Sequence, residues 1–179
     1  MIKKILVATH GTAGAVAAEQ YALDLARTLD AGLHALYVIH EGWGSLVGIE
    51  WLHSSETRMD FYRYAESELF RMADAALEDF VRRAAACGLN VTTSVRVGDP
   101  GEAIVSESRE RGSDLIVLGE AGGKRSEEYK AKISMNKLLK SAPCSVLRVK
   151  AAAREEKDAT LIGEEYTPRL YQIAPGAQG

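Results

Sequence analysis

Short apolar runs alternate along the first 150 residues with longer segments whose apolar residues recur every three or four positions. Five runs have the length and β-branched content of strands. They cover residues 2–9, 33–40, 89–97, 115–118 and 144–149. The four segments between them carry the helical period: 14–29, 59–87, 100–111 and 135–142. This alternation predicts an α/β domain with a mostly parallel sheet.

Several residues mark where the predicted helices begin and end. Asp99 and Pro100 form a typical start, as N-cap and first helical residue. Gly32, Gly88 and Gly112 each stand where a helix should end, because glycine adopts positive φ at little steric cost. The helix limits therefore follow from the sequence.

The second predicted helix is unusually long. Residues 59–87 would span about 43 Å at 1.5 Å per residue, which exceeds an average strand, so the first turns should project beyond the sheet. A long connection with both tryptophans, residues 41–57, precedes this helix. Connections of this length are usually functional or covered by other parts of the protein.

The stretch DLIVLGEAGG, residues 114–123, joins four consecutive apolar residues to three glycines. The apolar run suits a strand that is covered on both faces. Gly119, Gly122 and Gly123 permit positive φ or a close approach to the backbone. Two interpretations follow: a tight turn between strand and helix, or a ligand loop at the carboxyl end of a parallel strand.

Composition limits the class of protein. The 179 residues, 46% of them hydrophobic, suffice for one domain with a core and a tail. A net charge of −3 gives no general reason to expect nucleic-acid binding. No apolar run reaches the roughly 18 residues of a membrane span, and the run after Lys4 is too short for a signal peptide. We therefore expect a cytoplasmic protein that binds neither nucleic acid nor membrane.

Few residues suggest catalysis or metal binding. Cys87 and Cys144 form no redox or metal motif and are predicted to be small buried side chains. No serine has a histidine and an aspartate in a catalytic motif, and no carboxylate pair lies on the predicted loops. The histidines lack the short spacing of metal ligands: His10, His34, His40 and His53. We expect no enzyme and no metal centre.

The segments ILVATHGTAGAVAAEQYALDLARTLDAGLHALYV, VGDPGEAIV, DLIVLGEAGG and APCSVLRV follow one another in an order and spacing that resemble the universal stress protein family over residues 1–150. The resemblance implies a five-stranded parallel sheet in the order 3-2-1-4-5 with helices on both faces, Rossmann-like and of the adenine nucleotide alpha hydrolase-like kind. In such a sheet the strand order reverses between strands 1 and 4, where a ligand should bind. This favours the ligand loop.

ATP-binding members of the family share an Asp after strand 1 and the pattern Gly-x-x-Gly, nine residues, then Gly-Ser or Gly-Thr. This chain departs from the pattern at three positions, because His10 replaces the Asp and Lys132-Ile133 replaces Gly-Ser, with Ser134 one residue later. A side chain at Lys132 removes the closest approach of phosphate to backbone. We therefore expect no ATP bound in the family's usual way.

Other positions keep the pattern and define where an adenine nucleotide would bind in the alternative. The backbone of Val38 would meet the adenine. The candidate cofactor-binding positions include the altered His10 and Lys132 and the shifted serine. They are Ala8, Thr9, His10, Val38, Leu118, Gly119, Gly122, Gly123, Lys132 and Ser134. The alternative ligand is ATP or another adenine nucleotide.

A lysine-rich stretch surrounds the altered positions. Residues 124–140 contain six basic and two acidic side chains, a local charge of +4. Such a stretch is typical of a solvated helix face, but lysines can also hold phosphate as point charges. Both interpretations stay open.

The functional hypothesis is a non-enzymatic stress-response protein that dimerises and contacts a protein partner. The alternative is a nucleotide-dependent switch with slow hydrolysis at most. The family commonly dimerises through its last strand, and an aliphatic edge at residues 145–149 would otherwise stay open. We expect a homodimer through this strand, with residues 41–57 as a possible further contact.

Residues 151–179 form a tail beyond the domain. A charged linker, Arg154 to Asp158, precedes side chains too apolar for a plain disordered end: Leu161, Ile162, Tyr166, Leu170, Tyr171 and Ile173. We predict that the tail and the connection at 41–57 pack on each other, on the domain or on a neighbouring subunit. The alternative is a mobile connection and a frayed tail.

Overall fold

Strands and helices alternate along the chain as the sequence predicts. The computed structural model describes residues 1–41, 55–120 and 133–150. The strands are β1 (Lys4–Thr9), β2 (Gly32–His40), β3 (Val91–Gly98), β4 (Leu115–Gly119) and β5 (Ser145–Val149). The helices are α1 (Ala13–Leu29), α3 (Ser55–Ala86), α4 (Pro100–Arg111) and α5 (Met135–Ser141).

The five strands form one parallel sheet in the order β3-β2-β1-β4-β5, which confirms the order predicted from the family resemblance. β1 is the central strand, and its Val7 lies opposite Ala35 on one side and Val117 on the other. The direction of the connections reverses between β1 and β4. The carboxyl ends of these two strands are therefore the switch point at which a crevice is expected.

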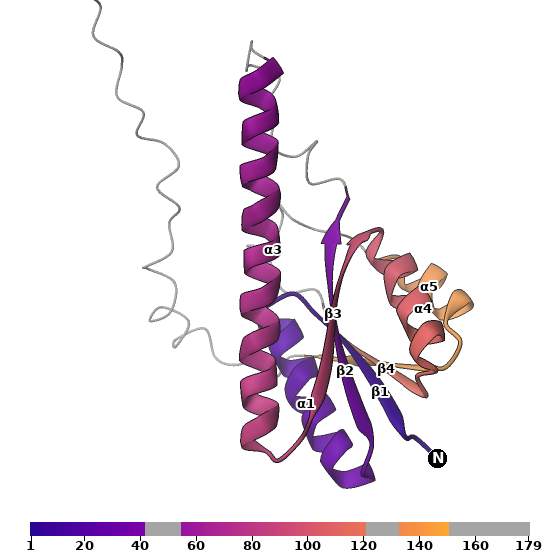
Figure 1. Ribbon diagram of the computed structural model, residues 1–179. Helices are drawn as coiled ribbons and strands as arrows, with labels where there is room; N and C mark the ends of the chain where they lie inside the picture. Colours follow the sequence, from indigo (N-terminus) through magenta and orange to yellow (C-terminus); the bar gives the residue numbers. More distant parts are fainter. Residues whose placement is uncertain (42–54, 121–132, 151–179) are drawn as a thin grey trace, which may run out of the picture.

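Helices cover both faces of the sheet (Figure 1). On one face, α1 and α3 pack on alternate strand residues such as Ile5 and Val7. On the other face, α4 and α5 pack on the intervening residues, such as Leu6 and Ile116. Burial on both faces explains why the central strands read as continuous apolar runs rather than alternating ones.

The ends of the shorter helices follow local chemistry. Asp99 caps α4 by accepting a hydrogen bond from the Glu102 amide at 2.9 Å, and Gly112 ends the helix at φ 61°. The prediction for α1 was wrong, since Asp30 ends this helix at φ 51° and Gly32 is already the first residue of β2. Aspartate adopts this left-handed conformation more readily than most side chains, because its short polar group bonds locally.

Helix α3 has 32 residues and measures about 48 Å at 1.5 Å per residue. It begins at Ser55, four residues before the predicted start, so residues 55–57 belong to the helix and not to the connection. Its buried residues lie toward its C-terminal end: Ala73, Leu77, Phe80 and Ala84. Figure 1 shows the first half projecting beyond the sheet, which confirms the predicted overhang.

The two cysteines are less buried than predicted. Cys87 follows the last turn of α3 and is exposed in the turn that leads to β3. Cys144 is half-buried, and its Sγ lies 3.4 Å from Ser108 Oγ. Among the described residues, no helix is long and apolar enough to cross a membrane. The connection at 42–54 and the tail from 151 lie outside the described residues.

Candidate functional site

The carboxyl ends of β1 and β4 lie side by side and form the candidate site. Ala8 pairs with Leu118 in the sheet, so the turns after the two strands start at the same level. His10 and Gly11 follow β1, whereas Glu120 follows β4. The structure thus brings the start of the predicted loop at Gly119 and Glu120 next to the end of β1.

Two glycines bring α1 into direct backbone contact with the end of β4. A Cβ atom on Gly119 would lie 2.2 Å from the carbonyl oxygen of Gly14, and a Cβ on Gly14 would lie 2.1 Å from that of Glu120. No side chain fits at either distance, so both positions require glycine. The tight strand-to-helix packing therefore gives Gly119 a structural role, and Gly14 is a site residue that the sequence analysis missed.

Thr9 faces the layer of α1 and α3. Its side chain is buried, and its hydroxyl donates a hydrogen bond to the buried carboxylate of Glu19 on α1. Arg83 of α3 forms an ion pair with the same carboxylate, and its guanidinium lies 5.4 Å from the ring centre of Phe80. Thr9 can therefore offer the crevice only its backbone. Sequence analysis missed Glu19, although it is an acidic residue between Ala18 and Ala22 on the buried stripe.

His10 lies on the same side as Thr9. It lines a hollow of about 300 Å³ together with Tyr37 of β2 and Met72 of α3, and its Nε2 lies 3.4 Å from Thr12 Oγ1. Loss of hydration lowers the pKa of His10, and the carboxylate of Glu19 only partly opposes this shift. The lowered pKa favours the neutral imidazole. It cannot reproduce the negative charge of the family's aspartate.

The opposite side of the crevice is apolar. Ala8, Val38 and Ile133 are half-buried and pack against the core cluster of α4 and α5, which contains Leu118 and Leu138. Ile133 holds the position at which ATP-binding members have Ser or Thr. Its side chain is thus part of the hydrophobic packing and offers no hydrogen bond.

Ser134 also has a structural partner. It is the N-cap of α5, and its hydroxyl accepts a hydrogen bond from the Lys137 amide at 3.4 Å. The remaining candidates, Gly122, Gly123 and Lys132, lie outside the described residues. Seven of the ten candidate positions therefore lie in the described residues, at the ends of β1, β2 and β4 and at the start of α5, and the side chains of Thr9 and His10 turn toward α1 and α3.

Ion pairs involve charged residues close to the crevice. Glu120 pairs with Arg148 of β5 at 2.8 Å, and its amide donates to the Val149 carbonyl. Lys137, from the lysine-rich stretch, pairs with Glu102 of α4 at 2.8 Å, and this hydrogen bond raises the pKa of Lys137. Lys137 therefore serves a contact between α4 and α5, which favours the interpretation of a solvated basic face for this lysine.

Within the described ranges, no three His, Cys, Asp or Glu side chains are grouped to hold a metal ion. A second hollow, of about 510 Å³, lies between α3 and β3 at the far edge of the sheet. This hollow lies apart from the ends of β1 and β4, whereas the smaller hollow borders them through His10 and Gly11.

Comparison with known proteins decides the family. The profile of the Universal stress protein family matches residues 1–150, which is most of the chain. The chain belongs to this family. It is 29% identical over 153 residues to universal stress protein YxiE of Bacillus subtilis, covering 84% of this chain and all of YxiE. It is 27% identical over 155 residues to universal stress protein MJ0531 of Methanocaldococcus jannaschii, covering 87% and 86% of the two chains.

Solved structures of universal stress proteins share the fold. UspA from Lactobacillus plantarum superposes with a TM-score of 0.62 at 26% identity, covering 83% of this chain and 97% of UspA. Two more distant structures, each 20% identical with a TM-score of 0.59, contain nucleotides. One is a universal stress protein in complex with cAMP, and the other is an Arabidopsis thaliana member with AMP bound. At this identity they establish the fold alone.

Proposed function

We propose that this universal stress protein is a non-enzymatic regulatory binding module that does not bind ATP in the family's usual way. The proposal concerns the crevice at the ends of β1 and β4. There the chain presents a neutral imidazole, a packed isoleucine and two glycines that already contact each other through their backbones.

The observation that carries the proposal is the position of Ile133. Its side chain packs on the core cluster around Leu118 and Leu138, where ATP-binding members place a hydroxyl that faces the phosphates. The isoleucine side chain has no hydrogen-bond donor, so this position offers no partner to a phosphate group. Together with His10, it removes two polar groups from a nucleotide site.

The nucleotide content of the purified protein tests this proposal. The chain is denatured and the supernatant is separated by chromatography, and ATP is titrated into the native protein by calorimetry. We expect no co-purified nucleotide and no heat of ATP binding at micromolar concentrations. Stoichiometric nucleotide, or a dissociation constant in the micromolar range, would overturn the proposal.

A gain-of-function variant serves as the matched control. The triple variant His10→Asp, Lys132→Gly, Ile133→Ser restores the family pattern at the three altered positions. We expect this variant to bind ATP where the native chain does not. In the same variant, Gly122→Val should abolish binding, because a side chain there closes the loop against the phosphates.

The second candidate function is an adenine-nucleotide switch. Two relatives with the same fold contain cAMP and AMP, and this chain keeps the apolar residues Ala8, Val38 and Leu118 beside the crevice. Such a site would bind the base and ribose without the phosphate cradle. Titration with AMP and cAMP separates the candidates, since micromolar binding of either nucleotide would favour the switch and absence of binding would favour the first proposal.

Assembly is part of the proposal. β5 is an edge strand with half-buried Val146, Leu147 and Val149, and an edge of this kind commonly pairs with a second copy. We propose a homodimer through β5, with further contacts to a protein partner. Sedimentation at tens of micromolar should give the mass of a dimer, and a monomer at these concentrations would contradict it.

A further inference from the structure

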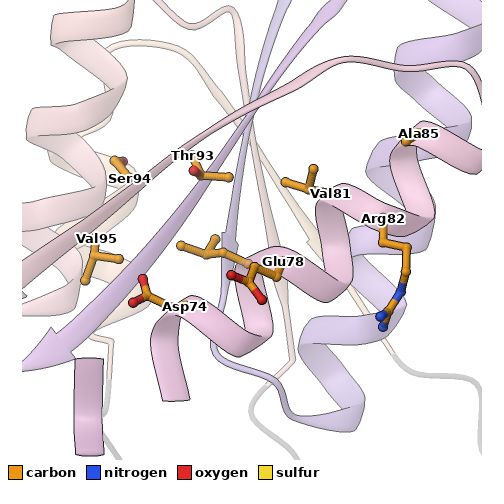
Figure 2. A pocket seen from close by; sticks show the side chains of 9 residues that line it. Asp74, Glu78, Val81, Arg82, Ala85, Thr93, Ser94 and Val95 are labelled. Atoms are coloured by element: carbon orange, nitrogen blue, oxygen red, sulfur yellow. The ribbon is translucent and has the colours of Figure 1, made fainter. Parts of the chain in front are cut away.

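An apolar groove separates α3 from the edge strand β3. It has a volume of about 510 Å³, and its apolar lining comes from Leu77, Val81 and Ala85 of α3 together with Val95 of β3. Figure 2 shows Asp74 beside Val95 at one end of the groove, with Val81 and Ala85 toward the other end. The groove therefore has an acidic end at the carboxyl end of β3, and its other end carries Val81, Ala85 and the side chain of Arg82.

The strand beside the groove has one open side. All eight residues of β3 pair with β2, and no further strand follows it in the described sheet. Alternate N–H and C=O groups of β3 therefore point away from the sheet. Val97 is 54% exposed, and proline and lysine, which commonly protect edges, are absent from β3. This edge is suited to pairing with another extended segment.

The acidic end of the groove has no cation in the described part of the chain. Asp74 and Glu78 lie one helical turn apart on α3, and neither forms a hydrogen bond or an ion pair with the described residues. Arg82, the next residue along this face, already pairs with Asp79. A segment that entered the groove with a basic residue first would match this charge.

We propose that residues 169–173 of the chain's own tail occupy the groove and extend the sheet beside β3. The sequence Arg-Leu-Tyr-Gln-Ile places Arg169, Tyr171 and Ile173 on one side of an extended segment. Pro168 and Pro175 bound the segment, and proline is typical of strand ends because it cannot donate to the ladder. The segment thus carries one basic and two large apolar side chains toward the groove.

The reach and direction of the tail agree with this position. β5 and β3 are parallel, so their carboxyl ends lie at the same end of the sheet. The chain therefore leaves β5 at the end of the sheet where the acidic end of the groove lies. Arg169 lies 19 positions after Lys150, and this stretch spans up to about 63 Å when extended. Crossing five strands takes about 19 Å and rounding a helix about 10 Å more. The tail therefore reaches the groove and runs antiparallel to β3.

The spacing along the groove also fits. Arg169 and Ile173 are about 14 Å apart in an extended chain, whereas Asp74 and Ala85 are about 16 Å apart along α3. With Arg169 at the acidic end, Tyr171 lies near Val81 and Ile173 near Ala85. A six-stranded sheet results, in which the tail covers an edge that would otherwise be open.

Disulfide trapping in the full chain tests the position. In a background with Cys87→Ser and Cys144→Ser, Val81→Cys is combined with Tyr171→Cys, and the matched control combines Ser106→Cys on the opposite face with Tyr171→Cys. We expect mild oxidation to link the first pair within one chain, seen by peptide mass mapping, and to leave the control reduced. No link, equal linkage in both pairs, or linkage only between two chains would overturn the proposal.

Charge reversal tests the direction of the segment. Arg169→Glu should slow disulfide formation between positions 81 and 171 about fivefold, and adding Glu78→Arg should restore the rate. Deletion of residues 169–179 should raise hydrogen exchange at the outward amides of β3 about tenfold, while β1 stays protected. If neither charge change alters the rate of disulfide formation, and the deletion leaves hydrogen exchange in β3 unchanged, this placement is contradicted.

Discussion

Among the described residues, each face of the sheet buries one glutamate, and the two are held by different partners. On the face of α1 and α3, Glu19 accepts a hydrogen bond from Thr9 and pairs with Arg83. The three residues come from α1, from the end of β1 and from α3. This contact therefore joins the candidate crevice to the long helix.

On the other face, Glu107 of α4 has more partners. It pairs with Arg96 of β3 and with Arg111, and it accepts a hydrogen bond from Ser94 at 3.0 Å. His34 Nε2 lies 2.9 Å from the same carboxylate. Although desolvation opposes the shift, the hydrogen bonds from the two arginines and the serine lower the pKa of Glu107 to about 2.

The difference lies in what each glutamate joins. Glu107 fixes α4 to the edge strand β3 and to its neighbour β2, away from the ends of β1 and β4. Glu19 accepts a hydrogen bond from Thr9, the residue that directly precedes His10 in the chain. We therefore expect Glu107, which has more partners, to contribute mainly to stability. We expect Glu19, which has fewer, to influence the candidate site as well.

The largest effect is expected from Glu107→Gln. The change leaves Arg96 and Arg111 without their common anion, and breaking a buried ion pair costs about 3–5 kcal/mol of unfolding free energy. Urea denaturation measures this loss. Glu110→Gln removes an exposed partner of Arg96 and should cost less than about 1 kcal/mol. Equal losses in the two variants would refute the distinction.

An acid titration sharpens the same comparison. The pKa of Glu107 is lowered from 4.5 to about 2 in the folded protein, so its stabilisation is complete above pH 5 and is lost as the pH falls toward 2. The loss should reach roughly 2–3 kcal/mol. Urea midpoints between pH 7 and pH 2.5 measure it. In Glu107→Gln this component should vanish, and an unchanged pH dependence there would contradict the assignment.

A smaller effect on stability is expected from Glu19→Gln. Losing the charged partner of Arg83 and the strong acceptor of Thr9 should cost about 1–3 kcal/mol. The variant should also lower the pKa of His10 further, because Glu19 is the group that raises it. Titration of the His10 ring by NMR measures this shift. Asp24→Asn on the exposed side of α1 is the control and should leave the pKa unchanged.

The fold could be predicted from the sequence because its signals are local. Apolar runs, helical periods and caps such as Asp99 act over a few residues, and the family resemblance supplied the strand order. The end of α1 was missed because Asp30 and Gly32 both tolerate the region where a helix ends, and only packing against β2 selects between them.

The candidate site was harder to predict. The sequence located the crevice through Thr9, His10 and Gly119, but it did not show that the side chain of Thr9 turns to Glu19. That contact depends on Arg83, which is 64 residues away from Glu19 along the chain. The role of Gly119 likewise depends on Gly14, whose backbone meets it only in the folded structure.

The overhang of α3 makes the helix a lever. From Ala73, the first buried residue, to Ser55 the helix extends for about 27 Å. A tilt of about 10° at the buried end would therefore displace the tip by roughly 5 Å. Because Arg83 ties the buried end to Glu19 and so to β1, a small tilt of the buried end relative to β1 becomes a larger displacement at the tip.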